Sequence, residues 1–135
     1  MEYRKPKRFK KIRHYLAGPF IFGMSIPILI LDVCVEIYHQ IAFRLYDIPI
    51  VKRSDYIRID RHKLKYLGLG DKINCAYCGY ANGFAAYLVE IAARTEKYWC
   101  GIKHQETKGF KQPKHHKNFV KYGDKKALEK KYGKQ

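Results

Sequence analysis

The longest apolar run of the chain lies near its N-terminus and predicts a helix that can enter a membrane. Residues 16–31 carry no charged side chain, and Asp32 is the first charge after them. Extended to Val35, the run would be about 30 Å long as a helix, which matches the thickness of a hydrocarbon layer. In a soluble domain, such a helix would need more surrounding protein than the rest of this chain supplies. We therefore expect residues 15–48 to form a membrane-associated helix.

Two arrangements of this helix remain open. Pro19 and Pro27 each remove a backbone donor, and Pro27 lies near the middle of the run. A re-entrant or interface-lying helix bent at Pro27 would keep the basic segments on both sides of it at one membrane face. A spanning helix would separate them. We prefer the first arrangement, because it also leaves the cysteines in the reducing cytoplasm.

The rest of the chain shows weaker patterns. Residues 50–66 alternate in part, which indicates a short strand or an extended interface segment, and residues 67–71 indicate a turn. Apolar side chains at helical spacing predict a helix over residues 83–98, with Asn82 as its cap. A short helix is expected within residues 124–132.

Small residues are concentrated at the start of the predicted second helix. Gly79 and Gly83, followed by Ala85 and Ala86, would let another backbone approach closely. The glycines do not match a Walker or Rossmann phosphate-binding pattern. Tight packing is therefore the preferred interpretation of this stretch.

Charge then narrows the choice of partner. The 135 residues include 28 Lys and Arg against 12 acids, a net charge of +16, together with 12 Tyr and 7 Phe. Such a surface favours an anionic partner. With the apolar helix present, we expect an anionic lipid membrane, a protein partner or a larger membrane complex, and not nucleic acid. The predicted lipid-binding residues are Lys7, Arg8, Lys10, Lys11, Arg13, Lys52 and Arg53.

Three of the four cysteines lie in a pattern typical of a metal site. Cys75 and Cys78 form a Cys-x-x-Cys pair, and Cys100 is followed by His104 after three residues. Two thiolates at that spacing on a turn can face one ion at about 2.3 Å, and the second pair completes a tetrahedral Cys3His set. We therefore predict a structural zinc site, with iron or an iron–sulfur cluster as the alternative.

The helix between the two pairs sets a condition on this site. If residues 83–98 are helical throughout, the helix ends lie about 24 Å apart, so the pairs meet only if the helix is shorter and both flanks fold back. Cys75 and Cys78 also precede a helix N-terminus, where a thiolate is stabilised as in redox pairs. A thiol redox or electron-transfer role for this pair is the alternative function, and plain buried cysteines are a third possibility.

Glu36 and His39 form half of the Glu-x-x-His pattern found in di-iron carboxylate sites. The second such motif and the additional glutamates are missing from the sequence. We therefore interpret these two side chains as polar groups at the membrane interface.

Residues 19–104 resemble a family of small, uncharacterised bacterial membrane proteins. The resemblance is carried by "PFIFGM", "YDIPIVKRSDYI", "IDRHKLKYL", "INCAYCGYANG" and "EIAARTEKYWCGIKH". It implies a bacterial source and membrane association, and it implies no reaction, ligand or partner. With the charge and the thiols taken together, we expect the bacterial inner membrane, with the soluble part in the cytoplasm.

Together these patterns predict a mainly α protein with one N-terminal membrane-embedded helix, a small helical Cys/His module and a basic tail. The expected segments are a basic juxtamembrane arm (1–14), the membrane-associated helix (15–48), the Cys/His module (49–106) and a lysine-rich tail (107–135). The predicted function is a membrane-anchored, metal-binding interaction module without catalysis.

Overall fold

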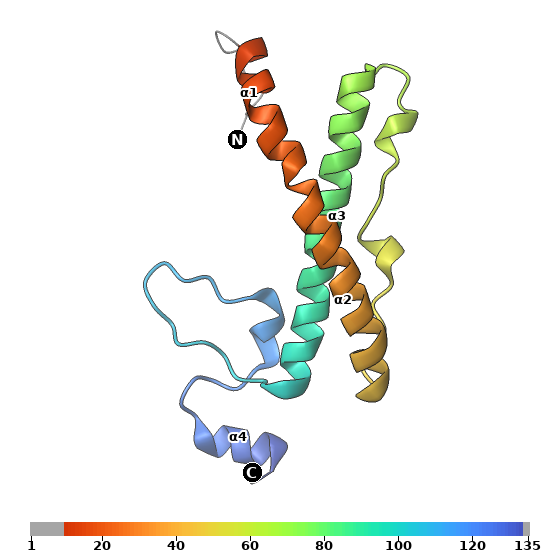
Figure 1. Ribbon diagram of the computed structural model, residues 1–135. Coiled ribbons are helices and arrows are strands. Elements are labelled where there is room, and N and C mark those ends of the chain that lie inside the picture. Colours follow the sequence, from red (N-terminus) through yellow and green to blue (C-terminus); the bar gives the residue numbers. More distant parts are fainter. Residues whose placement is uncertain (1–9, 134–135) are drawn as a thin grey trace. The chain divides into compact units, whose positions relative to one another are not determined.

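The computed structural model describes residues 10–133 and confirms a mainly helical protein (Figure 1). The described residues include no β-strand, only one isolated bridge between Ile102 and Val120. The chain divides into two compact units, residues 1–87 and residues 88–135. This boundary lies inside the predicted Cys/His module.

The apolar run forms two consecutive helices, α1 (Lys10–Gly23) and α2 (Ser25–Leu45), interrupted at Met24. Pro27 lies in the first turn of α2, where its missing N–H has no intrahelical partner to lose. In Figure 1, α1 continues into α2 without reversing direction, and the interruption lies at Met24 and not at the expected Pro27. By length and composition, residues 12–45 could cross a membrane, and only 11% of their most apolar stretch is buried.

One face of α2 packs against the rest of its unit. The buried side chains are Asp32, Val35, His39 and Phe43. Their spacing of three and four residues places them on one stripe of the helix. Large apolar side chains elsewhere on α2 are exposed, among them Ile30 (62%). The buried stripe is thus partly polar, while the exposed surface is apolar.

The segment after α2 forms neither the short strand nor any other sheet element. It contains two single turns of 3-10 helix, η1 (Arg53–Asp55) and η2 (Arg61–Lys63). Between these turns its backbone lies against α3 (Leu69–Trp99) at two glycines. A Cβ built on Gly83 would lie 2.7 Å from the carbonyl oxygen of Tyr56, which confirms the predicted close backbone approach.

The predicted helix over residues 83–98 was too short, because α3 begins at Leu69 and continues to Trp99. Asn82 is not a cap but lies inside the helix, where its amide donates to the carbonyl oxygen of Cys78 at 2.8 Å. Gly79 and Gly83 also lie inside α3, although glycine is unfavourable within a helix. Their packing against backbone offsets a helix-propensity cost of up to about 1 kcal/mol for each glycine.

The second unit contains the end of α3, η3 (Lys114–Asn118) and α4 (Lys125–Tyr132). Gly101, at φ +63°, ends α3 in the left-handed conformation that glycine adopts without strain. The core includes Ile91, Phe119 and Val120. Helix α4 confirms the short helix expected in the tail, and the Asp124 carboxylate caps it by accepting from the backbone N–H of Ala127 at 2.9 Å.

The close approach at Gly83 predicts that Gly83→Ala destabilises the protein. The added Cβ would meet the Tyr56 carbonyl oxygen and the Ile57 Cα, both closer than 3.0 Å, and neither is a flexible side-chain end. We expect a loss of about 1–3 kcal/mol in the free energy of unfolding, measured by circular dichroism in detergent. Gly70→Ala is the matched control, because a Cβ at Gly70 meets no atom within 4 Å. Equal melting temperatures for the two variants would contradict the packing described.

Candidate functional site

The predicted cysteine and histidine ligands lie at different places along the chain. Cys75 and Cys78 lie one turn apart within α3, and Cys100 directly follows its last residue. All four cysteines of the chain are free thiols. The two pairs could meet only if the helix between them were short and the chain before Gly83 folded back along it. This part of the chain is instead helical and belongs to α3. The structure does not bring the Cys3His set together, and that ion stays a prediction.

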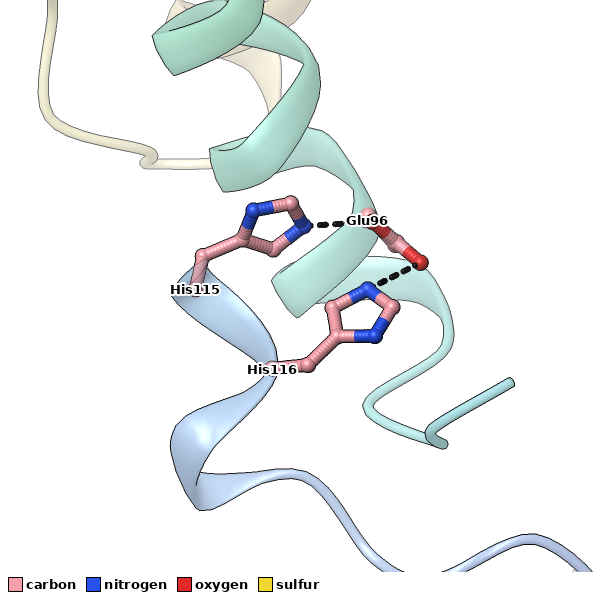
Figure 2. Close-up of side chains that lie close together, drawn as sticks. All are labelled: Glu96, His115 and His116. Carbon is pink, nitrogen blue, oxygen red and sulfur yellow. Dashed lines mark hydrogen bonds and ion pairs between the residues drawn. The ribbon is translucent and has the colours of Figure 1, made fainter. Parts of the chain in front are cut away.

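A different group of potential ligands does converge, in the second unit (Figure 2). The Glu96 carboxylate lies between two imidazoles, with Oε2 at 2.6 Å from His115 Nε2 and Oε1 at 2.9 Å from His116 Nε2. Glu96 comes from the last turns of α3, and both histidines come from η3. Within residues 10–133, this is the one group of three such side chains whose ligand atoms lie within 4.8 Å of one another.

The carboxylate of Glu96 is held in its charged form. Burial raises its pKa, but the contacts with the His115 and His116 imidazoles together outweigh burial and leave the pKa below its usual value. His116 itself is fully enclosed, with 1% of the residue exposed. Both histidines belong to the lysine-rich tail (107–135) predicted from the sequence, to which no ligand was assigned. The adjacent pair His115–His116 was the signal, but nothing in its spacing pointed to Glu96.

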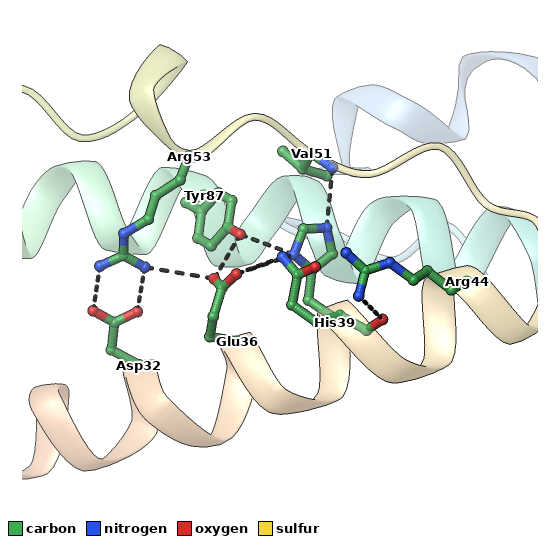
Figure 3. Close-up of polar contacts among 8 residues, drawn as sticks. Asp32, Glu36, His39, Arg44, Val51, Arg53 and Tyr87 are labelled. Carbon is green, nitrogen blue, oxygen red and sulfur yellow. Dashed lines mark hydrogen bonds and ion pairs between the residues drawn. The ribbon is translucent and has the colours of Figure 1, made fainter.

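A second polar cluster lies in the first unit and joins α2 to its neighbours (Figure 3). The Asp32 carboxylate accepts two hydrogen bonds from Arg53, at 2.6 and 2.5 Å, and a third from the Tyr80 hydroxyl. This hydrogen-bonded pairing raises the pKa of Arg53 above its ordinary value, so the guanidinium stays charged. The two-pronged geometry fixes the direction of the Arg53 side chain as well as its charge.

Glu36, His39 and Tyr87 continue the cluster as a chain of hydrogen bonds. The backbone N–H of Val51 donates to His39 Nε2 at 3.0 Å, so this nitrogen presents its lone pair. In the neutral imidazole the proton then lies on Nδ1, which is 2.9 Å from the Tyr87 hydroxyl. That hydroxyl donates onward to Glu36 Oε2 at 2.9 Å. Burial, together with the bond to Glu36, raises the pKa of Tyr87 to about 12, so the phenol keeps its proton at neutral pH.

The interpretation of His39 as an interfacial polar group was wrong. His39 is completely buried within the protein and is held by Val51 and Tyr87. Among the described residues, no buried side-chain nitrogen or oxygen lacks a hydrogen-bond partner. The spacing of Asp32, Glu36 and His39 by four and three residues was the available signal for a shared polar stripe.

The predicted lipid-binding residues differ in where they lie. Lys7 and Arg8 fall outside the described residues, and Lys10 and Lys11 begin α1. Arg13 and Lys52 are exposed. Arg53, by contrast, points to Asp32 and also lies 3.7 Å from Glu36, so its charge is balanced within the protein.

The hydrogen-bond chain predicts a specific cost for removing one hydroxyl. In Tyr87→Phe, Glu36 loses a donor and His39 Nδ1 loses an acceptor, while the aromatic packing is kept. We expect a loss of about 1–3 kcal/mol in the free energy of unfolding, measured in detergent. Tyr66→Phe is the matched control, because Tyr66 is 81% exposed. An unchanged stability of Tyr87→Phe would show that the chain of bonds contributes nothing to the fold.

In comparisons with known proteins, no family model, curated protein or solved structure matches this chain.

Proposed function

We propose that this chain is a membrane-anchored interaction protein without catalytic activity, held by α1 and α2 and assisted by its positive charge. The apolar surface of these helices contacts lipid. The remainder of the chain is presented to partners at the membrane surface. An anionic bacterial inner membrane, with the thiols on the cytoplasmic side, fits the charge of +16 and the free cysteines.

The observation that carries this proposal is the distribution of polar and apolar residues on α2. A surface helix of a soluble protein turns its apolar face inward and its polar face toward water. Helix α2 departs from this pattern, because its buried stripe includes Asp32 and His39, while Ile26, Ile30 and Val33 are 61–64% exposed. Ionisable residues in membrane helices face the protein interior and pair there, as Asp32 pairs with Arg53.

The distribution of charge supports the same arrangement. Residues 16–31 form an uncharged length of helix, and basic residues flank it in the first 14 positions and again from Arg44 onward. Each Lys or Arg near an anionic lipid surface contributes about 1 kcal/mol. Exposed Arg13 and Lys52 are available for such contacts, whereas Arg53 is committed to Asp32.

The alternative is a membrane-associated thiol redox or electron-transfer protein. Cys75 and Cys78 lie on successive turns of α3, and both are free. Reversible oxidation of this pair in a thiol titration, with no bound metal, would favour the alternative.

Flotation with lipid vesicles tests the membrane proposal. We expect the full chain to float with phosphatidylglycerol vesicles, and the triple variant Ile26→Asp, Ile30→Asp and Val33→Asp to remain in solution. An acidic residue in the middle of a membrane helix costs about 2.5–3.5 kcal/mol for each position.

The matched control is Ile59→Asp, Ile73→Asp and Val89→Asp. These positions are 45–63% exposed. Like the first triple variant, the control replaces two Ile and one Val by Asp, so both variants change the charge equally. The control should float like the original chain. The proposal fails if the two triple variants behave alike, or if the original chain stays dispersed without detergent. Displacement of the chain from vesicles by DNA, in a salt-dependent manner, would instead favour nucleic acid as the partner.

A further inference from the structure

The strongest unexplained feature of the second unit is the convergence of Glu96, His115 and His116. Two imidazole nitrogens approach one carboxylate, one at each oxygen, at 2.6 and 2.9 Å (Figure 2). The three side chains are partly or fully buried. Imidazole and carboxylate groups in this number form the His2Glu ligand sets of zinc enzymes.

The hydrogen bonds of Gln112 determine which nitrogen of His116 carries a proton. The Gln112 amide nitrogen donates to the carbonyl oxygen of His104 at 2.7 Å. Its amide oxygen therefore faces His116 Nδ1, at 3.1 Å, and that nitrogen must be the donor. In a neutral imidazole, Nε2 then presents a lone pair, and it presents this lone pair to a carboxylate oxygen at 2.9 Å.

Two acceptors at that distance repel each other unless a cation lies between them. A proton can bridge one nitrogen–oxygen pair, so two protons are needed to satisfy both imidazoles. One divalent ion can replace both protons and bind all three side chains. A metal-binding histidine typically donates its other ring N–H to a fixed acceptor, which is the role that Gln112 has here.

We propose that Glu96 and the Nε2 atoms of His115 and His116 bind one divalent transition-metal ion, for which Zn²⁺ is the best fit. At Zn–N and Zn–O distances of about 2.0–2.2 Å, tetrahedral ligands lie about 3.3–3.4 Å apart. The two nitrogen–oxygen pairs must therefore separate by less than about 1 Å from the distances given above. Two imidazoles disfavour Mg²⁺ and Ca²⁺, which take oxygen ligands.

This ligand set differs from the Cys3His set expected from the sequence, since the two share no residue. Three protein ligands leave one coordination position for water or a small ligand, as in open zinc sites. Cys100 lies one turn after Glu96, and the His104 and His116 ring centroids are 5.2 Å apart. Neither Cys100 nor His104 belongs to the converging group.

Zinc binding by the full chain in detergent tests the proposal. After treatment with a chelator and addition of zinc chloride, we expect about one zinc per chain by elemental analysis. In competition with a fluorescent chelator, His115→Gln and His116→Gln should each lower the zinc affinity at least about a hundredfold. His62→Gln, at an exposed histidine of η2, is the matched control and should bind like the original chain.

The double variant Cys75→Ser and Cys78→Ser separates the two ligand sets. It should keep the zinc affinity of the original chain. A loss of zinc in this variant, with zinc retained in His116→Gln, would overturn the proposal in favour of the Cys3His site. Equal zinc affinity in all these variants, or no zinc in the original chain, would overturn it as well.

Cobalt provides a readout that does not depend on any variant folding. Co²⁺ added to the original chain should give visible absorption bands without a sulfur-to-cobalt charge-transfer band, because the proposed ligands are nitrogen and oxygen. A strong charge-transfer band would place thiolates on the ion and contradict the proposal.

Discussion

The pairing of Asp32 with Arg53 is the interaction on which the first unit depends. A carboxylate on a largely apolar helix is costly to bury unless its charge is matched and its lone pairs are filled. Arg53 matches the charge with two hydrogen bonds, and Tyr80 fills a further position. This pairing ties α2 both to the segment after it and to α3. The segment cannot be displaced without leaving a buried charge unmatched.

The same segment also packs against α3, at two residues that have no side chain. Gly83 and Gly79 let the backbone of residues 56–58 lie directly on α3. Val51, a few residues earlier, donates its N–H to His39. Polar matching on α2 and close backbone packing on α3 therefore fix one stretch of chain that has almost no regular secondary structure.

The sequence was sufficient for features that depend on local pattern. The apolar run, the short helix near the C-terminus and the close backbone approach at Gly79 and Gly83 were predicted correctly. Ala85 and Ala86, which were expected to share that packing, are exposed. The length of α3 was not predicted, because two glycines, which are unfavourable within a helix, are stabilised there by a contact from a distant segment. The convergence of Glu96 with His115 and His116 was missed for the same reason. It depends on how the loop after Gly101 returns to α3, and no spacing rule describes such a return.

The interruption at Met24 has a mechanical consequence for the proposed membrane anchor. All the polar residues that tie α2 to the first unit follow the interruption, while α1 precedes it. A bilayer thicker or thinner than the apolar length is usually accommodated by tilting or kinking of the helix. A change of angle at this interruption would let α1 adjust its tilt to bilayers of different thickness while the hydrogen-bonded half of the anchor keeps its geometry.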